Sequence, residues 1–157
     1  MKKNLVYVLV GIMGSFSIVA CSNDNDDNGL DPVQAVSDIQ SNVVSGDWMI
    51  SSYVDSGVDE TSDYAGFTFT FSSDGVVSAS STAEMLTGAW SVEEDNSMDD
   101  SSDSDVDFTL FFGVPDTHDF DDLNDDWDVI TYTATMLSLR DVSGGSGEID
   151  TLVFTRK

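Results

Sequence analysis

Apolar and polar positions alternate along most of the chain after residue 46. The clearest case is residues 67–71, where Phe67, Phe69 and Phe71 alternate with two threonines. A period of two is typical of a strand with one buried face. The same reasoning predicts eight strands, at residues 48–53, 67–71, 76–80, 89–93, 106–112, 127–133, 136–141 and 149–156.

Residues 31–43 carry a helical pattern instead. Asp31 followed by Pro32 is a favourable N-cap and first helical position. Side chains then recur at helical spacing, at Val33, Val36, Ile39 or Gln40, and Val43. Gly46 ends this pattern, so we expect one short helix before the first strand.

Eight short strands separated by polar turns, with no second helical pattern between them, predict an all-β fold. We expect a small eight-stranded antiparallel up-and-down barrel, because closure removes exposed strand edges. Connections in such a barrel alternate between its two ends. The loops that should share one rim are 55–65, 81–87, 113–126 and 142–148.

The charge of the chain excludes one class of partner. It has 30 acidic residues against 5 basic ones, for a formal net charge of -25. A nucleic-acid-binding protein needs a basic surface to displace counterions from phosphate. We therefore expect no nucleic-acid partner.

The first 20 residues have the pattern of a secretion signal. Lys2 and Lys3 precede an uncharged apolar stretch, residues 5–20, that is short for a membrane span. Ile18-Val19-Ala20-Cys21 resembles the lipobox of bacterial lipoproteins, in which the cysteine is lipidated and becomes the new amino terminus.

The segment after Cys21 is polar and acidic. Residues 21–30 have the composition of a flexible tether, and an acidic run at this place is similar to the surface-export signal of Bacteroidetes lipoproteins. The resemblance implies an outer-membrane, surface-exposed protein, held to the lipid bilayer through acylated Cys21. A soluble secreted protein with an incidental cysteine is the alternative.

A second resemblance covers residues 31–157. Gly46-Asp47-Trp48 after a short helix resembles the G-x-W signature of lipocalins. Later segments are similar to the lipocalin-like domain of Bacteroidetes lipoproteins, among them 66–75, 88–92, 127–129, 137–139 and 152–156. The resemblance implies that Trp48 packs against Arg156 in a cation–π contact at the base of the barrel.

The loop 113–126 contains the best candidates for an ion site. It offers four carboxylates close together, the hard oxygen ligands that Ca²⁺ prefers: Asp116, Asp119, Asp121 and Asp122. The alternative is a solvated acidic loop that keeps the protein soluble. His118 lies in the same loop and could help to bind a transition metal. No other cofactor is expected.

We expect no enzymatic activity, since the sequence lacks a nucleophile elbow, a zinc-protease helix and a phosphate-binding glycine loop. The fold resemblance implies binding of a small apolar or amphipathic molecule. The alternative is a surface module that contacts a protein or glycan partner through its acidic loops. An interior cavity would favour the first, and an exposed aromatic patch the second.

Overall fold

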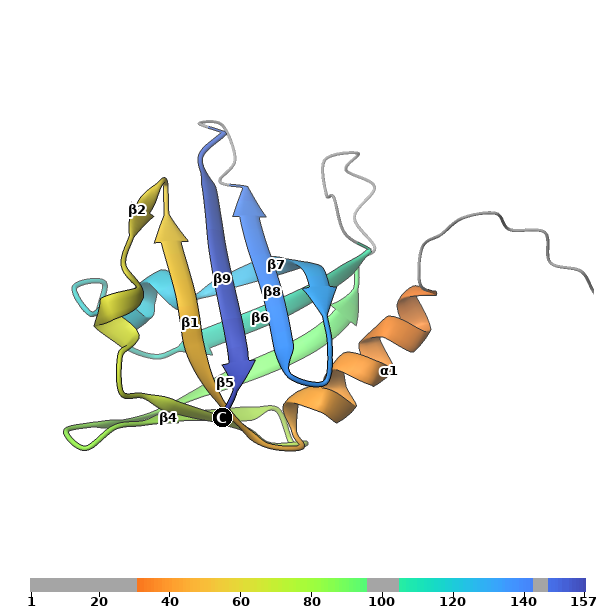
Figure 1. The fold of residues 1–157 in the computed structure, drawn as a ribbon, viewed down its shortest axis with the longest axis horizontal. Coiled ribbons are helices and arrows are strands. Elements are labelled where there is room, and N and C mark those ends of the chain that lie inside the picture. The colour runs from red at the N-terminus through yellow and green to blue at the C-terminus, as the bar shows by residue number, and fades with distance from the viewer. Residues whose placement is uncertain (1–30, 96–104, 143–146) are drawn as a thin grey trace, which may run out of the picture.

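The computed structural model describes residues 31–95, 105–142 and 147–157. They form one helix followed by nine strands and two single-turn 3-10 helices (Figure 1). In chain order the elements are α1 (Pro32–Val43), β1 (Asp47–Asp55), β2 (Val58–Asp59), η1 (Thr61–Tyr64), β3 (Thr68–Phe71), β4 (Val76–Ser80), β5 (Met85–Glu94), β6 (Val106–Phe112), η2 (Asp119–Leu123), β7 (Asp125–Tyr132), β8 (Met136–Val142) and β9 (Ile149–Arg156).

The sheet closes into a barrel. Every strand pairs antiparallel with its neighbours, in the order β1-β3-β4-β5-β6-β7-β8-β9, and β9 returns to pair with β1. The closing register runs from Trp48 opposite Arg156 to Val54 opposite Thr151. The two-residue strand β2 only extends the end of β1 as a tight hairpin. The predicted all-β, eight-stranded antiparallel barrel with one preceding helix is therefore confirmed.

The helix packs against the barrel wall formed by β5 and β6 (Figure 1). Asp31 caps it as expected, because its side chain accepts a hydrogen bond from the Val33 amide at 3.1 Å. The buried stripe differs from the prediction, since it consists of Ala35, Ile39 and Val43. Val33 is 61% exposed. It falls outside this stripe, which repeats every four residues.

Several strand boundaries differ from the prediction by one to four residues, and two of these differences change the loops. β5 begins at Met85 rather than residue 89, so the connection before it shrinks to residues 81–84. β7 begins at Asp125, which places Asp125 and Asp126 on a strand instead of in the acidic loop. No pattern in the sequence indicated η1 or η2, because a single 3-10 turn is too short to show a periodicity.

Contacts join three of the four loops predicted to share one rim, and residues 143–146 of the fourth lie outside the described residues. The Tyr64 hydroxyl donates to the Asp119 carbonyl at 2.6 Å, which joins the loops that come after β2 and β6. The Ser56 amide donates to Asp150 at 2.7 Å, and His118 lies 3.4 Å from Glu84. We call this rim the acidic end of the barrel. The opposite end, where Trp48, Arg156 and the last turn of α1 meet, is the helix end.

Several predictions fall outside the described residues. These are the signal peptide (1–20), the lipidated Cys21 and the tether (21–30). In the described part, α1 has twelve residues, and no helix there has the length and apolar character needed to cross a bilayer.

Candidate functional site

The helix end of the barrel is closed by Trp48. Its side chain is 1% exposed, and its indole N–H donates to the carbonyl of Val43, in the last turn of α1, at 2.9 Å. Helix C-termini leave carbonyls without a partner inside the helix. Trp48 therefore fills the base of the barrel and satisfies one of these carbonyls.

Arg156 lies beside Trp48, with its guanidinium carbon 5.6 Å from the centre of the indole ring. It also donates to the carbonyls of Asn42 and Ala134 and to the hydroxyl of Ser45. A cation at a helix C-terminus is favourable, and α1 has no basic residue of its own in its last turn. Gly46 leaves room for this contact, because a Cβ there would lie 2.6 Å from Arg156 Nε.

The barrel interior is filled by aromatic side chains. Phe69 is fully buried, and its ring centre lies 5.3 Å from that of Phe154, 5.8 Å from that of Phe120 and 6.5 Å from that of Phe112. These separations are typical of packed aromatic rings. A ligand in the centre of the barrel would have to displace several of these side chains.

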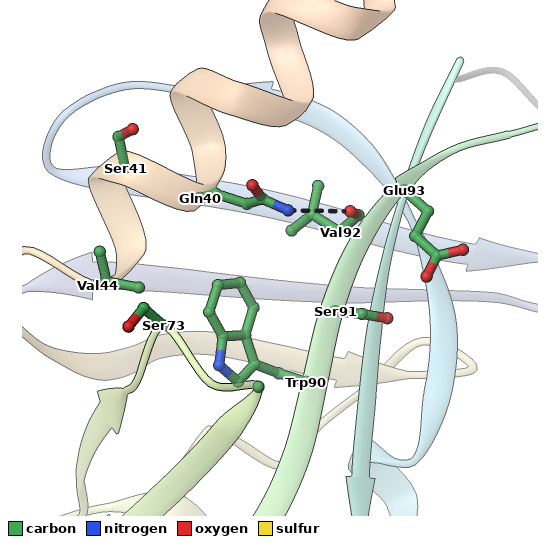
Figure 2. Close-up of a pocket in the computed structure, with 9 residues that line it drawn as sticks. Gln40, Ser41, Val44, Ser73, Trp90, Ser91, Val92 and Glu93 are labelled. Atoms are coloured by element: carbon green, nitrogen blue, oxygen red, sulfur yellow. Dashed lines mark hydrogen bonds between the residues drawn. The ribbon is translucent and has the colours of Figure 1, made fainter.

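A groove on the outside offers open space instead. It has a volume of about 440 Å³ and lies between the C-terminal half of α1, the β3–β4 turn and β5 (Figure 2). Small-molecule sites typically occupy about 300–1,000 Å³. Its lining includes Gln40, Ser41, Ser73, Trp90, Ser91 and Glu93. We call it the helix groove.

Trp90 forms the aromatic part of the helix groove and is held rigidly. Its indole N–H donates to the Ser72 carbonyl at 3.0 Å, and its backbone N–H donates to the Gly75 carbonyl at 2.9 Å. Gly75 has a φ of +82°, a conformation that glycine adopts without strain. On its inner side the indole stacks against Phe108, with ring centres 5.8 Å apart. The β3–β4 turn thus fixes the orientation of the indole.

The polar side chains of the helix groove come from three separate elements. Gln40 and Ser41 lie on α1, Ser73 lies in the β3–β4 turn, and Ser91 and Glu93 lie on β5. Figure 2 shows Gln40, Ser41 and Ser73 on the side of β5 to which the indole projects, whereas Ser91 and Glu93 project from the other side of the strand. The Gln40 amide donates to the Val92 carbonyl at 3.4 Å. Only a small part of the indole is exposed beside these polar groups.

The four candidate calcium ligands lie at the acidic end. Asp116 is in the loop before η2, while Asp119, Asp121 and Asp122 belong to η2 itself. The Asp121 carboxylate accepts a hydrogen bond from the Asn124 amide at 2.9 Å. Among the described residues, no three His, Cys, Asp or Glu side chains are grouped so that they could hold a metal ion. The calcium hypothesis gains no support from this geometry.

His118 has a local structural partner. Its Nδ1 accepts from the Phe120 amide at 3.2 Å, which caps η2, and its Nε2 faces Glu84 at 3.4 Å. It borders a shallow hollow of about 240 Å³ that also includes Asp63 and Asp119. Transition-metal binding by His118 would require this cap to open, since Nδ1 is already occupied.

Carboxylates crowd one another at the acidic end. Burial raises the pKa of Asp122, and the charges of Asp55, Asp121, Asp119 and Asp63 raise it further. On the barrel wall, burial and then neighbouring carboxylates raise the pKa of Asp107 to about 6. In each of these two places carboxylates lie close together despite their repulsion, which lowers the stability of the folded state.

The sequence analysis did not identify the helix groove. Trp90, on the strand predicted at residues 89–93, is only 7% exposed. The groove arises because α1 lies across β5, and no local sequence pattern predicts that contact. Three serines that line the groove, Ser41, Ser73 and Ser91, are widely separated in the sequence and form no local pattern that would predict a groove.

No protein-family model matches the chain, and no curated protein matches it. Among solved structures, the chain is similar to the crystal structure of a DUF4847 family protein from Bacteroides vulgatus. The two share 14% sequence identity and a TM-score of 0.47, over 76% of this chain and 97% of the other. The function of this chain must therefore be derived from its own geometry.

Proposed function

We propose that this chain is a lipid-anchored, outer-membrane binding protein without catalytic activity, and that it takes a small amphipathic molecule in the helix groove. One observation carries the proposal: the barrel interior is packed with aromatic rings, whereas an open groove of about 440 Å³ lies outside it, lined by polar side chains together with Val44, Val92 and a small exposed part of Trp90. A concave site lined by apolar side chains with a few polar groups is typical of small-molecule binding.

Binding rather than catalysis is supported by the chemistry of the groove. Of the residues that line it, only Glu93 carries a carboxylate, and none is a histidine, cysteine or lysine. General acid–base or nucleophilic catalysis usually needs a second titratable group nearby. A single carboxylate is better suited to accepting a hydrogen bond from a ligand.

The anchor is supported by the sequence before residue 22. The charged start, the apolar stretch and the lipobox-like Ile18-Val19-Ala20-Cys21 together favour lipidation at Cys21. We expect Cys21→Ala to release the protein from the membrane fraction and to abolish labelling by fatty acids. Surface exposure predicts cleavage by protease added to intact cells. A Cys21→Ala variant that still incorporated fatty acid would contradict the anchor.

Native mass spectrometry of protein purified from its own host tests the binding site. We expect a small-molecule adduct on the wild type that is lost from Ser73→Tyr, because a tyrosine in the β3–β4 turn fills the groove. Ser62→Tyr places the same side chain at an exposed position of η1 and is the matched control. An adduct that survives Ser73→Tyr would place the ligand elsewhere, and no adduct at all would contradict binding.

A partner that contacts the acidic loops is the second candidate. It is favoured by the hydrogen bonds between Tyr64 and Asp119 and between Tyr53 and Asp122, which hold these loops in a fixed arrangement. Such a partner would be basic, since electrostatic complementarity directs association. Its binding would be weakened by Asp119→Asn and left unchanged by Ser73→Tyr.

A further inference from the structure

The outer face of the barrel wall at β4, β5 and β6 carries a row of exposed apolar side chains. In the register of the sheet, Val76 lies opposite Ala89, and Ala89 lies opposite Phe111. Residues paired in this way point to the same side of a sheet, and all three are exposed. Phe111 is 57% exposed and Val76 is 38% exposed. We call these three residues the apolar row. It lies on the opposite side of β5 from the buried Trp90.

The apolar row is continuous rather than scattered. Neighbouring strands lie about 4.8 Å apart, so the three side chains are adjacent to one another. Met85 lies on the same face of β5, is 73% exposed, and extends the apolar surface toward the acidic end. Single exposed apolar side chains are common on any protein, whereas adjacent ones rimmed by polar residues are typical of an interaction surface.

A second row on the same face is acidic and lies four positions along each strand. Glu93 lies opposite Asp107, and Asp107 lies opposite Asp128. We call these three residues the acidic row. Like charges directly opposite one another destabilise a sheet. Burial and then the neighbouring carboxylates raise the pKa of Asp107 to about 6. Arg140 lies 3.6 Å from Asp128 and offsets its charge at one end of the row. A cation from outside would relieve the repulsion between Glu93 and Asp107.

Two other occupants of this surface fit less well. A second copy of the chain would bring its own acidic row and a further net charge of -25, and an anionic bilayer would be repelled in the same way. A neutral bilayer would accept Phe111 but would do nothing for the acidic row beside it. The two rows together match a partner that is apolar at one place and positively charged at another.

We infer that this wall of the barrel binds a basic segment of another protein. An apolar side chain of the partner packs on Phe111 and Val76, while its lysine or arginine side chains pair with Glu93 and Asp107. The two rows are about 13 Å apart, since four strand residues rise about 3.3 Å each. An extended segment therefore carries a basic side chain four residues from an apolar one. The inference does not depend on a ligand in the helix groove, which lies on the other side of β5.

A titration with a synthetic peptide, followed by nuclear magnetic resonance at physiological ionic strength, tests the inference. The peptide has leucines at its first and third positions, lysines at its fifth and seventh, and threonines between them. We expect saturable shifts of backbone amide signals centred on Val76, Ala89, Phe111 and Asp107. A peptide with serines in place of the leucines should bind about tenfold more weakly, and one with glutamates in place of the lysines should not bind. The absence of a saturable shift would overturn the inference.

Variants of the chain assign the binding to the two rows. Phe111→Thr should weaken the affinity for the peptide about tenfold, and threonine is a good strand former, so the fold is kept. Asp107→Asn should weaken it about threefold and reduce its dependence on salt. Ile149→Ser, at a 48% exposed site of β9, and Asp116→Asn, at an exposed site, are the matched controls and should leave the affinity unchanged. Controls as weak as the test variants would reduce the binding to unspecific attraction and overturn the inference.

The remaining outcomes separate this surface from the others. Ser73→Tyr fills the helix groove and should leave the affinity for the peptide unchanged. If Asp119→Asn weakened the peptide more than Asp107→Asn, the basic segment would bind the acidic end and the inference would be wrong. It would also be wrong if phosphatidylcholine vesicles, instead of the peptide, bound the wild type and not Phe111→Thr, since the wall would then contact a bilayer.

Discussion

At both ends of the barrel, buried aromatic side chains donate hydrogen bonds to backbone carbonyls of a neighbouring helix, but the charges at the two ends have opposite signs. At the helix end, the Trp48 indole and the Arg156 guanidinium donate to carbonyls at the C-terminus of α1. At the acidic end, the hydroxyls of Tyr53 and Tyr64 donate to carbonyls of η2, at 3.1 Å and 2.6 Å. In each case a large aromatic side chain fills the end of the barrel and donates a hydrogen bond to a backbone carbonyl.

The difference lies in the charges. Arg156 puts a cation where the helix dipole favours one. The acidic end gathers carboxylates around η2, and the pKa values of Asp122 and Asp150 are raised by burial and by neighbouring carboxylates. The comparison shows that packing decides the fold at both ends, while electrostatics stabilises the helix end and weakens the acidic end.

The largest effect should come from Trp48→Ala, which removes the side chain that closes the helix end. Truncating a fully buried tryptophan costs about 3–5 kcal/mol of unfolding free energy, a large part of the stability of a small domain. Urea denaturation followed by circular dichroism measures this. Val58→Ala, at a site that is 58% exposed, is the control. A cost for Trp48→Ala as small as that of the control would show that the helix end is not needed to hold the barrel.

The next effect concerns Gly46 and Arg156. Arg156→Ala removes hydrogen bonds from a charged donor, which are typically worth about 1.5–3 kcal/mol. Gly46→Ala should cost a similar amount, because its Cβ would lie 2.6 Å from Arg156 Nε and displace the guanidinium. The two changes remove the same contacts, so the double variant should cost clearly less than the sum of the singles. Strict additivity would mean that Gly46 is required for another reason.

Local patterns predicted most of the fold. The phenylalanine–threonine alternation at β3 and the Asp31-Pro32 start of α1 appear in the sequence. The contact of Trp48 with Arg156 was implied instead by the resemblance of Gly46-Asp47-Trp48 to the G-x-W signature. Local patterns did not predict the exposure of Val33, the two 3-10 turns or the helix groove. Each depends on where α1 or a loop comes to lie against a distant strand, and a periodicity of two or 3.6 carries no such information.

At the acidic end, Tyr64→Phe tests whether the tyrosine hydroxyl matters as much as the indole does at the helix end. The ring stays buried, but the Asp119 carbonyl loses its donor, and we expect a cost of about 1–2 kcal/mol. Tyr132→Phe, whose ring is only partly buried, should change stability by less than about 0.5 kcal/mol. Equal effects of the two variants would contradict the comparison, because the acidic end would then be closed by ring packing alone.

The smallest effect, and the one that separates packing from charge, is the dependence of stability on pH. Asp107 should contribute to this dependence, because burial and then Asp95, Asp126, Asp128 and Glu93 raise its pKa from 3.8 to about 6.

A carboxyl group whose pKa is higher in the folded state than in the unfolded state holds its proton better when folded. Its contribution to stability is complete below pH 3.8 and is lost as the pH rises through about 6. We therefore expect the melting temperature to fall between pH 4 and pH 6.5, and Asp107→Asn to flatten this fall and to raise the melting temperature at pH 7.

Asp116→Asn, an exposed site, removes the same unit of charge and should do neither. Asp122→Asn should resemble Asp107→Asn, since the pKa of Asp122 is raised by the same causes. If Asp116→Asn had as large an effect as the other two, net charge alone would destabilise the protein. The raised pKa values of Asp107 on the barrel wall and Asp122 at the acidic end would then not report local destabilisation.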